Sequence, residues 1–481
     1  MAAHAGRALN LPARPIAAGA LILASLAGVA LAVQPRAGIA VVVALCYVPL
    51  VLLNLRLAIA LWLPLIFLEA LPAFNAAGKA AGLMLAVAWF GTLGNESRAA
   101  MVATIVARHR RLLEVLVLLL VWLSVSILWA EAPGHVLADL WHWFALALLW
   151  LVLATMLDTP RALRLAAGAF VTGALLSVLF GVLTGGLGPG AATRLEGAAG
   201  DANFLAASLV AAMVLAAALA GTTPSPLARW AGLTAIPLLA AGLVTSQSRG
   251  GTLAAICTVV VALVVFRGRR THVAAFALLI IAIAGMWFSL SPTAWERVTA
   301  VDDDGSGRSS LWTVAWRVVE DHPFEGVGLN NFIVVAGDYV REPGALSRVR
   351  LIAEDPHFVH NLYLQVLAEN GIVGLILYSL FIVGCLRAAL LAAQRFAARG
   401  DPAMETLARA VLVAAISMLI SAFFLSSMVD KRMWVLFALG PALLAVASRP
   451  GAAAERQPPP SRAPRSPPLR SRLRPAPIAR W

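Results

Sequence analysis

The chain has 481 residues, of which 61% are hydrophobic and 13% charged, and its formal net charge is +13. A soluble domain of this length is nearer half apolar and a quarter charged, so the composition excludes that class of protein. Apolar runs of roughly 17–20 residues recur along the chain, and each is long enough to cross ~30 Å of hydrocarbon as a helix. The sequence therefore predicts an all-α, polytopic transmembrane helical bundle of about 12–14 spans, with one large periplasmic loop that contains short helices.

Residues 1–15 are expected to form a cytoplasmic N-terminus, and residues 16–291 the first set of transmembrane helices. Arg7 and Arg14 precede an apolar stretch that ends at Ala32, as in a cleavable signal peptide. Because another apolar run follows at once, we expect an uncleaved first helix. The expected spans of this part are 16–33, 37–53, 56–73, 80–94, 112–130, 138–156, 161–183, 203–220, 230–246, 250–266 and 272–290.

The remaining segments differ in polarity. Residues 292–371 are expected to form the large periplasmic loop, which carries an active-site helix, and residues 372–448 the last three spans, at 372–391, 407–427 and 433–447. The Pro- and Arg-rich tail, 449–481, holds eight arginines and one glutamate, a net charge of +7 out of the +13. We expect this cytoplasmic tail to be disordered and to contact anionic membrane lipids, with no nucleic-acid partner. The cysteines are too few and too scattered for a disulfide framework or a zinc site.

Basic residues in the short loops predict the orientation, because Lys and Arg collect in cytoplasmic loops. The loop that contains Arg98 and Arg108 is therefore expected to be cytoplasmic, and alternate loops after it are also basic. The periplasmic side then receives residues 131–137, 184–202, 247–249, 292–361 and 428–432. The exceptions on that side are Arg194, Arg249, Arg308, Lys431, Arg432, His357 and His360. They are either snorkelling or salt-bridged loop residues, or a site that binds an anion at the outer leaflet.

The turn SQSRGG (246–251) places Arg249 between two apolar spans, with Ser248 before it and Gly250 after it. The next helix starts here, so its N–H groups favour an anion, and the glycines let the backbone approach a ligand closely. A guanidinium at this depth is costly without a partner. A diphosphate would match its forked donors, and the structural alternative is a salt bridge to Asp201.

A second polar cluster, TRLEGAAGDANF (193–204), also leads into a span. Arg194 would reach the same outer-leaflet surface as Arg249, and Asn203 lies nearby in the sequence. For Asp201 the alternative to a functional role is a structural one, because an Asp before an apolar run is a typical helix N-cap.

The stretch DPHFVHNLYLQVLAEN (355–370) raises the question of why polar residues precede a span. Asp355 followed by Pro356 predicts the start of a short helix that ends at Asn370-Gly371. His357, His360 and Asn361 would then share one face of a helix along the outer membrane surface. The helix dipole would keep the imidazoles neutral and able to accept a proton. The alternatives are a surface histidine pair, or a metal site with Glu354, for which no third close ligand is evident.

The stretch HNLYLQVLAENGIVGLILYSLF (360–381) resembles the signature of the O-antigen ligase and polymerase superfamily. SQSRGG resembles the Ser-Arg-Gly turn of that family, and residues 307–332 resemble the part of its periplasmic loop that ends in Gly-x-Gly. The 194–207 stretch resembles another family segment, with Ala202 where a proline is common. The resemblance covers roughly residues 190–445. Three spans after the loop also match, whereas the eleven expected before it exceed the usual nine.

The resemblance implies an enzyme of the bacterial inner membrane whose active site faces the periplasm. It would move a glycan (an O-antigen) from undecaprenyl diphosphate onto an acceptor hydroxyl, first of all that of lipid A–core, with inversion. His360 would accept the proton of the acceptor hydroxyl, and Arg249 with Arg194 would hold the diphosphate in place of a metal. The substrate-binding residues would be Arg308, His357, Asn361, Ser248, Gly250 and Asn203, with no cofactor. The alternatives are an O-antigen polymerase, a protein O-oligosaccharyltransferase, a small-anion transporter and a lipid-binding scaffold.

Overall fold

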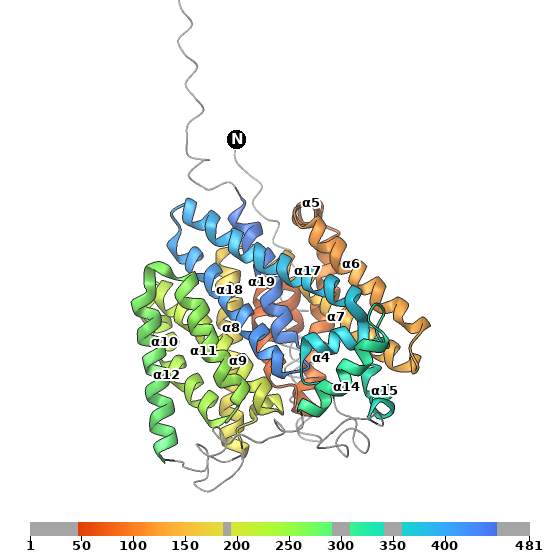
Figure 1. Cartoon of the computed structure of the whole chain (residues 1–481). Helices are drawn as coiled ribbons and strands as arrows, with labels where there is room; N and C mark the ends of the chain where they lie inside the picture. The colour runs from red at the N-terminus through yellow and green to blue at the C-terminus, as the bar shows by residue number, and fades with distance from the viewer. Residues whose placement is uncertain (1–46, 186–193, 291–307, 341–357, 450–481) are drawn as a thin grey trace, which may run out of the picture.

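The structure is a computed structural model that describes residues 47–185, 194–290, 308–340 and 358–449. Within these ranges the secondary structure is entirely helical (Figure 1). Nine of the described helices are long and apolar enough to cross a membrane, and two shorter apolar helices, Leu55–Phe67 and Arg249–Val265, accompany them. The predicted all-α, polytopic helical bundle is therefore confirmed.

The first half of the described chain forms six α-helices. They are α3 (Leu55–Trp62), which continues as the 3₁₀ turn η1 (Leu63–Phe67), α4 (Pro72–Thr92), α5 (Glu96–Arg108), α6 (Arg110–Val125), α7 (Pro133–Met156) and α8 (Pro160–Gly185). Several of them begin at a proline, whose missing N–H costs nothing in the first helical turn.

The second half contains α9 (Ala202–Thr222), α10 (Pro226–Thr245), α11 (Arg249–Val265), α12 (Arg270–Leu290), α14 (Arg308–Asp321), α15 (Phe332–Tyr339), α17 (Leu362–Ala398), α18 (Pro402–Ser421), the 3₁₀ turn η6 (Ala422–Phe424) and α19 (Lys431–Ala447). The apolar windows of α9 and α18 are 72% buried, whereas that of α12 is 0% buried. Helices α9 and α18 thus form the centre of the bundle, and α12 lies on its outside beside α10 (Figure 1).

Two sequence predictions of helix boundaries were wrong. The expected span 56–73 is interrupted, because α3 ends at Trp62 and α4 begins only at Pro72. The 3₁₀ turn η1, with Pro64 as its second residue, follows α3. Proline lacks the N–H and clashes with the preceding turn, so a helix does not run through these positions undisturbed. The expected spans 16–33 and most of 37–53 lie outside the described residues.

The helix expected from Pro356 to Glu369 instead begins at Leu362. Asn361 is its N-cap, with Oδ1 accepting from the backbone N–H of Tyr363 and Leu364 at 3.0 and 3.1 Å. His360 therefore precedes the helix, so the predicted helical face shared by His360 and Asn361 does not form. Asp355 to His357 lie outside the described residues, and the part of the prediction that concerns His357 is not tested. The expected stop at Gly371 is a kink within α17, where φ is 63° and ψ is −172°.

The short helices α14 and α15 form a second small apolar core that docks on the first part of α17. Backbone N–H groups of Val327 and Gly328 donate to the carbonyls of Ala368 and Glu369 at 3.0 and 2.8 Å. The kink at Gly371 brings the chain against the carbonyl of Phe324, where a Cβ would overlap it. Only glycine fits this backbone conformation and this contact.

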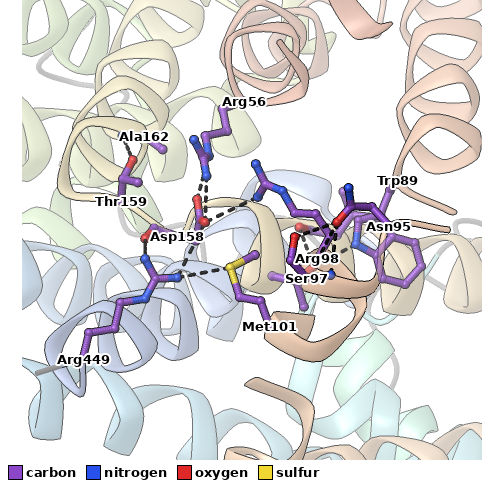
Figure 2. A network of polar contacts seen from close by, with 12 residues as sticks. Arg56, Trp89, Asn95, Ser97, Arg98, Met101, Asp158, Thr159, Ala162 and Arg449 are labelled. Carbon is purple, nitrogen blue, oxygen red and sulfur yellow. Dashed lines mark hydrogen bonds and ion pairs between the residues drawn. The ribbon is translucent and has the colours of Figure 1, made fainter. Parts of the chain in front are cut away.

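The loops sort to two ends of the bundle. At one, which we call the arginine-rich end, Arg56 Nη2 donates to Asp158 Oδ2 at 2.7 Å, and Arg98 and Arg449 each lie 3.6 Å from the same oxygen (Figure 2). At the other, the site end, the α8–α9 connection meets the α10–α11 turn, because Leu195 N–H donates to the Thr245 carbonyl at 3.1 Å. This sorting matches the loop alternation in the sequence.

Candidate functional site

The turn between α10 and α11 presents Arg249 at the start of a helix. Ser248 is the N-cap of α11, and its Oγ accepts from Gly251 N–H at 3.0 Å, so Arg249 is the first helical residue and is exposed. A Cβ on Gly251 would lie 2.5 Å from Ala206 Cβ, and one on Gly250 would lie 3.1 Å from Phe424 Cβ. The two glycines thus bring α11 close to α9 and η6, and a role of Gly250 in ligand binding stays a prediction.

Arg194 reaches this turn from the α8–α9 connection. Its Nε donates to the carbonyl of Ser246 at 3.0 Å, and its Nη2 donates to Asn203 Oδ1 at 2.7 Å. The same Oδ1 accepts from Ser248 Oγ at 2.8 Å. Asn203 therefore joins the two segments that carry Arg194 and Arg249, and Ser248 contributes a buried hydroxyl to that junction.

Asp201 has the structural role that its position suggested. It is the N-cap of α9, and its Oδ1 accepts from the N–H groups of Asn203 and Phe204 at 2.7 and 3.0 Å. Ala202 is the first residue of α9, a position at which proline is also well tolerated. The departure from the family pattern at Ala202 thus costs the helix no hydrogen bond.

Arg308 begins α14 and belongs to the same electrostatic neighbourhood. Burial is the first cause that lowers its pKa below the ordinary value, and the positive charges of Arg194 and Arg249 lower it further, while the carboxylate of Asp201 opposes them. Arg308 therefore interacts electrostatically with two arginines from two other segments at the site end. Such a gathering of guanidinium groups favours a bound anion.

His360 lies beside this cluster in an uncommon backbone conformation. Its φ is 54°, in the left-handed region, and its N–H donates to Ser426 Oγ at 3.0 Å. One turn into α14, Trp312 Nε1 donates to the carbonyl of Val359 at 3.1 Å. Because Phe424 packs on Gly250 while Ser426 holds His360, the α18–α19 connection links the histidine to the turn of Arg249.

The structure thus brings Arg194, Arg249, Arg308, Asn203 and Ser248 to one end, with His360 and Asn361 joined to them. His357 lies outside the described residues. Asn361 is 8% exposed and caps α17, so its amide oxygen holds the helix start that follows His360.

Sequence reasoning did not assign Arg432 to the site. Its side chain is 11% exposed and forms an ion pair with Asp430 at 2.9 Å. Its guanidinium carbon lies 5.7 Å from the ring centroid of Phe204 and 6.0 Å from that of Phe67, within cation–π range. The signal in the sequence was a basic pair in a loop where positive charge is scarce. Arg432 therefore packs against the start of α9 beside Asn203.

An apolar cavity of about 520 Å³ lies next to this region, between η1, α4, α7 and the start of α19. Its lining is largely aliphatic and aromatic, and it includes Glu69 and Lys431, whose side chains form an ion pair at 2.6 Å. The cavity thus has an apolar lining with one ion pair at its edge. Lys431, a member of that pair, is the residue before Arg432 in the sequence.

Comparison with known proteins shows a family similarity over part of the chain. Residues 233–379 match the family model described as O-antigen ligase, and a search of curated proteins found no match. The matched segment runs from α10 into α17 and contains Arg249, Arg308 and His360, whereas Arg194 and Asn203 precede it. The match covers 233–379 of the 481 residues, so over this segment the chain is similar to the O-antigen ligase family.

Proposed function

We propose that the chain is a glycosyltransferase of the bacterial inner membrane. It moves a glycan from undecaprenyl diphosphate onto an acceptor hydroxyl at the periplasmic face, with lipid A–core as the first candidate acceptor. The observation that carries the proposal is the convergence of Arg194, Arg249 and Arg308, which come from three separate segments, at one end of the bundle.

The chemistry needs charge stabilisation more than it needs a general acid, because diphosphate is already a good leaving group. Guanidinium groups match phosphate oxygens with paired hydrogen bonds, and fixed donors stabilise the negative charge that develops as the sugar leaves. Arg194 is fixed by Ser246 and Asn203, whereas Arg249 is exposed at the start of α11. Arg249 is thus the accessible diphosphate ligand and Arg194 its rigid neighbour, so the transfer proceeds without a metal.

His360 is the proposed general base. A left-handed conformation at a non-glycine residue costs free energy, and such residues concentrate at functional sites. The hydrogen bond from His360 N–H to Ser426 maintains the conformation. Removal of the acceptor's hydroxyl proton by the imidazole allows direct displacement at the anomeric carbon, and hence inversion. Asn361 and His357 are proposed to orient the base or the acceptor.

The lipid part of the donor needs an apolar surface beside the diphosphate. The cavity of about 520 Å³ between η1, α4 and α7 offers such a surface, with Lys431 among its lining residues. An isoprenoid chain in contact with this lining would leave its diphosphate at the level of the helix ends.

Other functions predict other arrangements. A polymerase or a protein O-oligosaccharyltransferase would use the same donor chemistry and differ only in the acceptor. A small-anion transporter would need basic groups along a path from one end of the bundle to the other. The three arginines instead lie at one end of the bundle, which favours the transferase over the transporter. A passive lipid-binding scaffold would not require a histidine in a strained backbone conformation.

The test in cells is deletion of the gene, followed by analysis of the surface glycans. We expect one glycan to lose its attachment to lipid A–core while its undecaprenyl-diphosphate-linked form accumulates. Complementation with the natural gene should restore attachment, and Arg249→Ala should not. Glycans of unchanged attachment and length in the deletion strain would refute the proposal, and a glycan that is attached but short would select the polymerase.

A further inference from the structure

A second cavity, lined by basic side chains, lies at the arginine-rich end, remote from the site already described. Its volume is about 510 Å³, and it is lined by Arg108, Arg395, Ala398, Arg399, Ala447 and Ser448. It therefore lies where α5, α17 and α19 end. Half of its lining residues are arginines, and none is acidic.

Two of the three lining arginines donate to neutral acceptors. Arg395 donates to Ser448 Oγ, and Arg399 donates to the carbonyl of Arg449. Arg449 itself donates to the carbonyl of Asp158 at 2.6 Å, and the carboxylate of Asp158 is shared with Arg56 and Arg98 (Figure 2). Within the described part of the chain, the carboxylate of Asp158 is thus already shared by three guanidinium groups and compensates little of the positive charge of the lining arginines.

The pKa of Arg108 responds to the neighbouring positive charges. Its pKa is lowered from the ordinary value, first by burial and then by the positive charges of Arg395 and Arg449. The three lining arginines are exposed, so the cavity is open to solvent, and an anion that fits between their guanidinium groups would relieve their mutual repulsion.

The position of the cavity indicates the source of the anion. Helix α6 begins at Arg110, α17 ends at Ala398 and α19 ends at Ala447, so the cavity lies at the level where three apolar helices begin or end. That is the level of the lipid headgroups, where basic pockets between helices bind anionic lipids. Helix α17 has 37 residues, so roughly 55 Å of helix separates this cavity from the start of α17 beside His360.

We propose that this cavity binds the phosphate group of an anionic phospholipid headgroup, through Arg108, Arg395 and Arg399. The site is separate from the glycan-transfer site and does not depend on that function. Inorganic phosphate offers the same chemistry from a soluble source, and the experiment distinguishes the two.

The test uses the full-length protein in phosphatidylcholine nanodiscs that contain phosphatidylglycerol, with native mass spectrometry of the lipid retained after release. Arg108→Gln and Arg399→Gln should each weaken retention of phosphatidylglycerol by roughly fivefold, and the double variant by roughly 25-fold. Arg108→Lys should retain more lipid than Arg108→Gln, because lysine keeps the positive charge and loses only the paired N–H donors of the guanidinium group. Arg229→Gln, at an exposed arginine of α10, is the matched control and should retain lipid like the natural protein.

Equal retention of phosphatidylglycerol by all variants would overturn the proposal. So would inorganic phosphate that raises the thermal unfolding temperature of the lipid-free protein while phosphatidylglycerol fails to do so, because the anion would then be soluble. Loss of retention in Arg229→Gln to the same extent as in Arg108→Gln would also overturn it, since the effect would reflect general surface charge. Unfolding temperatures in neutral detergent identify any variant that fails to fold, and Arg399→Gln then replaces Arg108→Gln in the comparison.

Discussion

Arg249 and His360 belong to different steps of the proposed transfer, so their substitutions should have separable effects. Arg249→Lys keeps the charge and loses the planar pair of donors, and donor binding should weaken about 10- to 150-fold, the equivalent of about 1.5–3 kcal/mol. His360→Ala should leave donor affinity nearly unchanged and lower the single-turnover rate by ~10²–10⁴. Both quantities are measurable on protein in nanodiscs, with Arg229→Lys as control. If His360→Ala lost donor affinity yet turned over bound donor at the normal rate, the histidine would be a ligand clamp.

His109, between α5 and α6, should make stability depend on pH. Burial lowers its pKa to about 4, a hydrogen bond with the backbone of Pro441 opposes this, and the charge of Arg108 adds to it. The folded state thus keeps the imidazole neutral, while the unfolded chain takes up a proton below pH about 6.5. The stabilisation is complete above pH about 6.5 and is lost as the pH falls toward 4, by about 3 kcal/mol at most.

The measurement is the unfolding free energy in detergent at pH 7.5 and pH 4.5. His109→Gln should flatten the pH dependence, whereas His272→Gln, at an exposed histidine, should not. A pH dependence that is the same in the natural protein and in His109→Gln would contradict this assignment.

At the scale of elements, the contact between α17 and the α14–α15 unit depends on the kink at Gly371. Gly371→Ala would place a methyl group on the carbonyl of Phe324 and force alanine into a region that only glycine populates, at a cost of about 1–3 kcal/mol before the clash is counted. We expect faster amide hydrogen exchange in residues 323–331. Gly168→Ala in α8 is the matched control, because no heavy atom lies within 4 Å of its added Cβ. Unchanged exchange in Gly371→Ala would show that the unit is held elsewhere.

Helix positions were largely readable from the sequence, because a lipid-spanning helix needs a long apolar run between polar ends. The expected span 203–220 is α9, Ala202–Thr222, and 272–290 is α12, Arg270–Leu290. The break at Pro64 was missed because hydropathy does not register a lost backbone hydrogen bond. The start of α17 was misjudged because Asp355-Pro356 is a typical helix start in a sequence, whereas the observed N-cap is Asn361. The segment before it is held by the hydrogen bond from Trp312 Nε1 to the Val359 carbonyl, a contact between distant residues that no local pattern shows.

The candidate site was readable in part. Basic residues on the side where they are scarce pointed to Arg194, Arg249 and Arg308. The hydrogen bonds that join them were not readable, because Asn203 and Ser248 are 45 residues apart and their contact depends on how α9 packs against α11. The left-handed conformation of His360 was equally hidden, since Ser426 imposes it from another connection. Arg432 was noticed as an exception, but its position beside Phe204 follows only from the packing of α19.

At the scale of the whole molecule, the proposed orientation requires the site end and the arginine-rich end to face opposite sides of the membrane. In a background without the natural cysteines, Glu320→Cys on α14 should react with an impermeant thiol reagent in intact cells. Ala397→Cys, near the end of α17, should react only after permeabilisation. Both positions are exposed, so protein burial does not limit the reaction. Labelling of Ala397→Cys alone in intact cells would invert the proposed orientation.

The proposed role requires that this chain itself transfers a glycan from a lipid diphosphate to an acceptor hydroxyl. The most direct measurement mixes purified protein with undecaprenyl-diphosphate-linked glycan and lipid A–core, and follows both glycosylated acceptor and released undecaprenyl diphosphate. We predict equal amounts of the two products, an inverted anomeric linkage, activity that persists in EDTA, and a loss of ~10²–10⁴ in rate with His360→Ala. Folded protein that binds the donor but releases no undecaprenyl diphosphate, or that needs a divalent metal to do so, would contradict the account.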